Sequence, residues 1–134
     1  VGHYALVDSL LGAEIADGTK WQDVPVDFTP DSTDGRMMVI NSTGIVGELY
    51  RKTLTGLTSG GDYVVTVWAV NAQDGQAANL PSLRMSVEPD GGGAEIASDT
   101  TDAIAIEDSI VWHSYTFGFT ANATSMDFVL STAE

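Results

Sequence analysis

The amino-acid sequence predicts an all-β protein, an antiparallel β-sandwich of the jelly-roll type. One observation is the run YVVTVWAV at residues 63–70, which is almost wholly β-branched or aromatic and therefore suits a pleated, packed surface. A second is the spread of 14 glycines, with serine, threonine and aspartate, along the whole chain. This spread leaves no long stretch with an uninterrupted helical period. About eight short strands between polar turns, without helices, are typical of an antiparallel sandwich.

In the first half of the chain, strand signals alternate with loop signals. Leu10–Ala16 fits either a helical turn or a strand, and Asp17–Gly35 contains enough glycine and proline for a long loop. A glycine-rich turn separates the last two strands of this half, so we expect them to pair, with Trp68 buried in a central strand. The four expected strands are His3–Asp8, Arg36–Asn41, Glu48–Thr55 and Asp62–Asn71.

The second half contains further strands, most of them with a period of two. Residues 83–87 alternate between apolar and polar, which predicts a half-exposed strand. Ile110–Thr120 places three aromatic side chains on one face, and Ser125–Ser131 alternates in a similar way. We expect Pro89–Asp102 to be a loop and Ala103–Ile106 to be a short strand.

The composition limits the class of protein. The 134 residues suffice for one domain, residues 1–134, and the absence of cysteine excludes disulfides and thiolate metal sites. With 19 acidic residues against 5 basic ones, the net charge of −14 repels phosphate backbones, so nucleic-acid binding is not expected. No apolar run approaches the ~18 residues of a membrane span, so membrane insertion is not expected either. The acidic surface suits salty or extracellular conditions.

Several segments of the chain, taken in order, resemble a known family. They are DGRMMVIN (34–41), TLTGLT (53–58) with DYVVTVW (62–68), NLPSL (79–83), and WHSYTF (112–117) with ANAT (121–124). Together they resemble the galactose-binding-like jelly-roll domains, similar to carbohydrate-binding modules, of secreted and surface proteins of bacteria. The resemblance covers about residues 34–131 and implies an extracellular or cell-surface location. The terminal strands usual in the family are absent from this sequence, and family calcium sites commonly draw on them.

Four residues are candidate ligand contacts. Trp21 and Gln22 lie in a polar loop, where an indole ring can stack on the C–H face of a sugar beside hydrogen-bonding groups. Trp112 opens a strand and can serve in the same way, and Arg84 can donate two hydrogen bonds to hydroxyls or carboxylates. The alternatives stay open: either tryptophan can pack against the sheet, and Arg84 can pair with a neighbouring acid.

The candidate metal ligands are Asp90, Glu95, Asp99 and Asp102. They belong to a stretch, Glu88–Asp108, that contains seven acids and no base. Calcium takes about six to eight oxygen ligands from flexible loops, so calcium is the one cofactor that the sequence suggests. The spacing matches no EF-hand or glycine-rich repeat, and a solvated acidic face is the alternative.

Catalytic patterns are missing from the sequence. Cysteine nucleophiles are excluded, and there is no Gly-x-Ser-x-Gly elbow and no zinc-binding pair of histidines. We therefore expect a non-catalytic carbohydrate-binding or adhesion module of a larger extracellular protein, with a glycan as its partner. The alternative is a structural surface domain or filament subunit that exchanges or accepts a β-strand with other subunits. A glycan hydrolase with two carboxylates is the third hypothesis.

Overall fold

The computed structural model describes residues 3–11, 21–28, 35–41, 46–74 and 80–133, and in these residues the protein is all-β, without a helix. This confirms the predicted class. The expected elements at Leu10–Ala16 and Asp17–Gly35 lie partly outside the described residues. The strands are β1 (His3–Val7), β2 (Met37–Asn41), β3 (Glu48–Thr55), β4 (Asp62–Ala69), β5 (Ser82–Pro89), β6 (Ala97–Thr100), β7 (His113–Thr120) and β8 (Ser125–Ala133).

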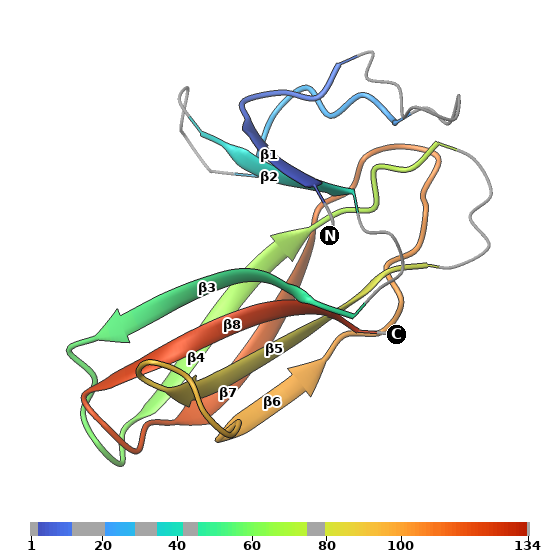
Figure 1. Ribbon diagram of the computed structural model, residues 1–134. Helices are drawn as coiled ribbons and strands as arrows, with labels where there is room; N and C mark the ends of the chain where they lie inside the picture. Colours follow the sequence, from blue (N-terminus) through green and yellow to red (C-terminus); the bar gives the residue numbers. More distant parts are fainter. Residues whose placement is uncertain (1–2, 12–20, 29–34, 42–45, 75–79, 134) are drawn as a thin grey trace.

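These strands form three antiparallel sheets (Figure 1). The largest has the order β3-β8-β5-β6, and a second sheet pairs β4 with β7. The third is a two-stranded ribbon of β1 and β2, in which His3 pairs with Asn41 and Val7 with Met37. The ribbon lies beyond one end of the other two sheets (Figure 1).

The hydrophobic core is built from the four-stranded sheet and the β4–β7 sheet. Alternate residues of β5, β7 and β8 point inward because successive side chains of a strand face opposite sides. The ring centroids of Phe117 and Phe119 are 5.9 Å apart, and Tyr63 lies 5.8 Å from Phe119. A core shared by two sheets is consistent with a β-sandwich. The buried cluster consists of Met85, Val87, Phe117, Phe119, Ala121, Met126, Phe128 and Leu130.

One expected strand pair is wrong. β3 pairs with β8, and β4 pairs with β7, so the two strands that flank the glycine-rich turn belong to different sheets. Gly56 and Gly60 have φ angles of 74° and 83°, which glycine adopts readily. The Leu57 N–H donates to the Thr124 carbonyl (3.1 Å), and the Gly60 N–H donates to the Ala121 carbonyl (2.6 Å). These bonds fasten the turn to the β7–β8 connection.

The expected position of Trp68 is also wrong. Its strand has one neighbour in the described sheets, and the inward side chains of β4 are Tyr63, Val65 and Val67. Trp68 is on the opposite face and is 41% exposed. Similarly, β6 lies within the expected loop Pro89–Asp102, whereas the expected strand Ala103–Ile106 makes only an isolated bridge, from Ile106 to Asn71.

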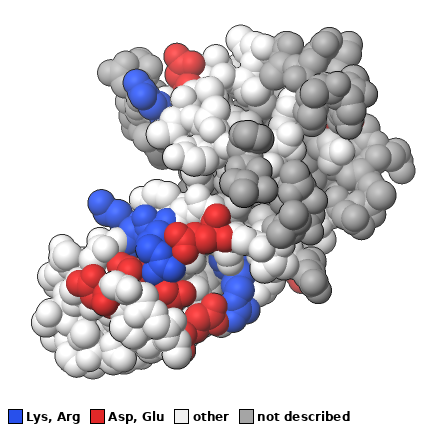
Figure 2. Space-filling model, in the orientation of Figure 1, with Lys and Arg blue, Asp and Glu red and all other residues white. Residues whose placement is uncertain are grey.

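The outer face of the four-stranded sheet carries a network of ion pairs around Arg51. Figure 2 shows basic and acidic side chains gathered together on one face of the molecule. The Arg51 guanidinium lies 2.8 Å from Glu48, 2.9 Å from Glu88 and 3.2 Å from Asp127. The buried Asp127 carboxylate also accepts hydrogen bonds from the Thr53 hydroxyl (2.7 Å) and the Gly91 N–H (3.3 Å). These hydrogen bonds hold the pKa of Asp127 below its ordinary value, and the bond from Thr53 has the largest effect.

Candidate functional site

The candidate site is a cleft between the β1–β2 ribbon and one end of the sheets that enclose the core. Its volume is about 760 Å³. All four residues Met37–Ile40 of β2 line one side, and residues 67–72, at the end of β4 and beyond it, line another. Four aromatic side chains also line the cleft: Trp21, Phe28, Trp68 and Trp112.

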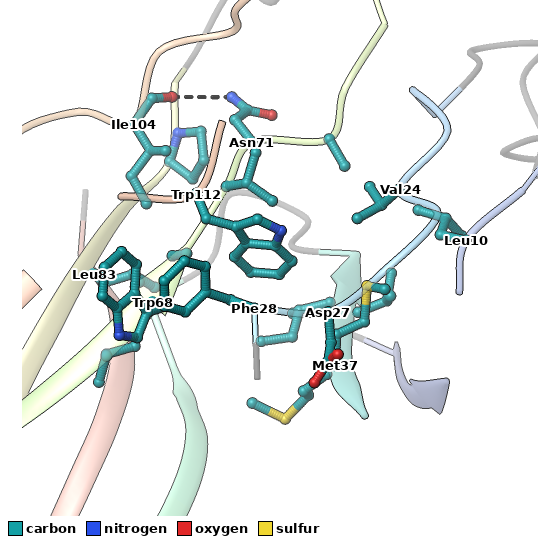
Figure 3. Close-up of a pocket in the computed structure, with 18 of the residues that line it drawn as sticks. Leu10, Val24, Asp27, Phe28, Met37, Trp68, Asn71, Leu83, Ile104 and Trp112 are labelled. Carbon is teal, nitrogen blue, oxygen red and sulfur yellow. Dashed lines mark hydrogen bonds between the residues drawn. The ribbon is translucent and has the colours of Figure 1, made fainter. Parts of the chain in front are cut away.

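Three of these aromatic side chains form one group (Figure 3). The rings of Phe28 and Trp68 are stacked, with centroids 3.5 Å apart and an angle of 20° between their planes. Trp112, directly before β7, is tilted by 50° to Phe28 at 6.4 Å. In the view of Figure 3 the Trp112 ring lies between the Phe28–Trp68 pair and Val24. Phe28 therefore covers one face of the Trp68 ring. Trp112 is tilted to Phe28 and is not stacked on it face to face.

The segment that contains Trp21 is held in place by backbone pairing. Trp21 forms an isolated antiparallel bridge with Gln73, and the Gln22 N–H donates to the Ala72 carbonyl (2.7 Å). The Gln22 side-chain amide donates to the carbonyls of Gln73 (3.0 Å) and Glu107 (2.9 Å). Gln22 therefore joins two distant segments and is not among the cleft-lining residues, whereas its neighbour Trp21 lines the cleft.

The cleft contains few polar side chains that a ligand could reach. The Asn71 amide donates to the Ile104 carbonyl (3.0 Å), and its oxygen accepts from the Gln73 N–H (3.1 Å). Two charged residues of opposite sign, Asp27 and Arg36, also line the cleft. The indole N–H groups of the three tryptophans make no hydrogen bond within the part of the chain that the structure describes. The site can thus offer flat apolar rings and a few donors to a ligand.

Arg84 lies away from the cleft. Its neighbour on β5, Leu83, lines the cleft, so the Arg84 side chain projects from the opposite face of the strand. There it donates to the Glu95 carboxylate (3.1 Å) and the Ser98 hydroxyl (2.7 Å). The bond to Glu95 raises the pKa of Arg84 and lowers that of Glu95. Ion pairing with a neighbouring acid, one of the two expectations for Arg84, is confirmed.

Three of the four candidate metal ligands engage different partners. Asp90 accepts a hydrogen bond from the Ser125 hydroxyl (2.6 Å), Asp99 accepts one from the Thr100 N–H (2.8 Å), and Glu95 binds Arg84. Asp102 is exposed after the end of β6. Within the described ranges, no three His, Cys, Asp or Glu side chains are grouped to hold a metal ion. Calcium binding stays a prediction.

The sequence patterns did not indicate Phe28 and Trp68 as site residues. Phe28 is, like Trp21, a large aromatic residue in a loop segment, so the same signal marks it as a candidate. No comparable signal existed for Trp68, because every residue from 63 to 70 except Thr66 is apolar or aromatic and the outward face cannot be distinguished.

Comparisons of the chain with protein-family models, curated proteins and solved structures find no match. Among the described residues, no helix is long and apolar enough to cross a membrane.

Proposed function

We propose that this chain is a non-catalytic carbohydrate-binding or adhesion module of a larger extracellular protein. One observation carries the proposal: Trp21 and Trp112, distant in the sequence, line the same cleft, together with Phe28 and Trp68. A pyranose presents a C–H face that packs on an aromatic ring, and its hydroxyls accept hydrogen bonds from indole N–H groups. Trp112, which meets Phe28 at an angle of 50°, is the main stacking surface.

We also propose a jelly-roll fold and an extracellular or cell-surface location for this protein. The all-β arrangement suits a jelly roll of the galactose-binding-like kind, which the motifs of residues 34–131 resemble. Such modules occur in secreted and surface proteins, and a net charge of −14 keeps a protein soluble outside the cell. The calcium site is proposed in the acidic Glu88–Asp108 stretch.

A glycan array followed by titration of the best binder tests the proposal, with calcium and with a chelator. We expect Trp112→Ala to weaken binding by about tenfold or more, equivalent to about 1.4 kcal/mol. Tyr50→Ala is the matched control, because Tyr50 is 44% exposed on β3 and does not line the cleft. Absence of binding to any glycan in both conditions, or equal losses in the two variants, would overturn the proposal.

A further inference from the structure

The edges of the two sheets that enclose the core differ in their protection against pairing with another chain. An unpaired strand edge exposes N–H and C=O groups, and charged residues, bulges or short strands usually block it. β3, one edge of the four-stranded sheet, carries Glu48, Arg51 and Lys52, and its register shifts between Glu48 and Tyr50. β6, the other edge, has four residues and includes Asp99. Both edges of this sheet are therefore protected.

Beyond its first residue, the edge of β4 has none of these features. This strand has eight residues, and in the described sheets it pairs only with β7. Its one charged residue, Asp62, is at the first position, and no proline interrupts it. The other edge of the same sheet, β7, contacts β6. The β1–β2 ribbon also carries no blocking charge, but its strands have five residues each.

From Val64 to Trp68, beyond Asp62, the outer face next to this edge is uncharged. Val64 is 66% exposed, and Thr66 and Trp68 project from the same side of β4. Their cross-strand neighbours on β7 are Gly118, Thr116 and Ser114. In a protein with a net charge of −14, two copies can approach closely only where acidic side chains are absent, and this strip meets that condition.

We propose that the free edge of β4 pairs antiparallel with β4 of a second copy, forming a continuous β7-β4-β4-β7 sheet. The contact is isologous, so it closes as a dimer with two-fold symmetry. A register centred on Val65 sets Val64 opposite Thr66 of the second copy. The two Asp62 residues then lie six residue steps apart, about 20 Å, well beyond the Debye length of about 8 Å at physiological salt. This dimer does not depend on the proposed glycan binding.

Sedimentation velocity of the whole chain tests the dimer, from about 10 µM to about 1 mM protein and at about 0.1 M and about 1 M NaCl. We expect the dimer fraction to rise with concentration and with salt, because salt screens the repulsion between the acidic copies. Thr66→Lys sets two ammonium groups on diagonal positions about 7–8 Å apart across the contact. We expect it to raise the dimer Kd by about tenfold.

Thr116→Lys is the matched control. Thr116 pairs with Thr66 on the same exposed face but belongs to β7, and the change in net charge is identical. We expect this variant to dimerise like the unmodified chain. Circular dichroism and urea unfolding verify that each variant is folded, and Val64→Lys replaces Thr66→Lys where the latter unfolds. A monomer at every concentration and salt condition, or a dimer that both lysine variants affect equally, would overturn the proposal.

Discussion

Replacing Trp68 by alanine distinguishes two structural roles of this side chain: a residue of the sandwich core, or a support for the segment that contains Phe28. If Trp68 belonged to the core of the sandwich, its loss would destabilise the strands around Phe117 and Phe128 together. In the structure it lies outside that core and stacks on Phe28, at 3.5 Å between ring centroids. The substitution therefore weakens the attachment of the Phe28 segment and of β2, and leaves the core intact.

The size of the effect follows from the covered surface of Trp68. The residue is 41% exposed, so roughly three fifths of a side-chain surface of about 200 Å² is covered. At about 25 cal/mol/Å², this area of about 120 Å² corresponds to about 3 kcal/mol. Ring stacking adds about 0.5–1.5 kcal/mol, whereas an unfolded segment already buries part of its apolar surface. We expect a net loss of about 2–3 kcal/mol.

Amide hydrogen exchange measures where this loss occurs. We expect the free energy of opening to fall by that amount in residues 21–28 and in β2, with protection in β8 unchanged. Val64→Ala is the control, because Val64 is 66% exposed on the same face of β4 and its truncation costs less than about 0.5 kcal/mol. An equal loss of protection in β2 and β8, or no change in either, would contradict this position of Trp68 outside the core.

Three further predictions concern the core, the outer face and the cleft. Met126→Ala is expected to cost about 2–5 kcal/mol in urea unfolding, because Met126 is fully buried in β8 and the change leaves a cavity. The pKa values of Asp127 and Glu95 are lowered in the folded state, so their contributions to stability are complete above the ordinary carboxyl range and are lost as the pH falls through the folded pKa values. Acid titration of the unfolding free energy, with Asp127→Asn flattening the curve, checks this sign. Gly35→Ala is expected to displace Asp27 from the cleft wall, since a Cβ atom at position 35 collides with the Asp27 carboxylate; the Asp27 carboxyl signal in NMR spectra reports the displacement.

Strand positions could be predicted from the sequence more reliably than strand partners. The alternation in residues 83–87 and in Ser125–Ser131 follows from the period of two and matches β5 and β8. The pairing of Glu48–Thr55 with Asp62–Asn71 failed, because a glycine-rich turn between two strands suggests a local hairpin. The actual partners, β8 and β7, are decided by core contacts between residues distant in sequence.

The candidate site likewise contains residues that the sequence could indicate, whereas the positions of others depend on the fold. Trp21 could be selected because a large aromatic side chain in a polar loop is informative by residue type, and Trp112 because it opens a strand. Gln22 and Arg84 failed to join them in the cleft because each forms hydrogen bonds elsewhere, Gln22 to the carbonyls of Gln73 and Glu107 and Arg84 to Glu95. Such hydrogen-bond partners depend on the fold, so no local sequence pattern predicts them.

The proposed function requires that a glycan binds in the aromatic cleft. The chain has three tryptophans, so a ¹H–¹⁵N NMR spectrum contains three indole N–H signals, which single substitutions assign. Titration with the glycan that binds best on the array tests the claim directly. We predict that the Trp112 and Trp21 signals shift with the same Kd as the binding isotherm. Saturable binding that leaves both signals unmoved would contradict the assignment of the cleft as the binding site.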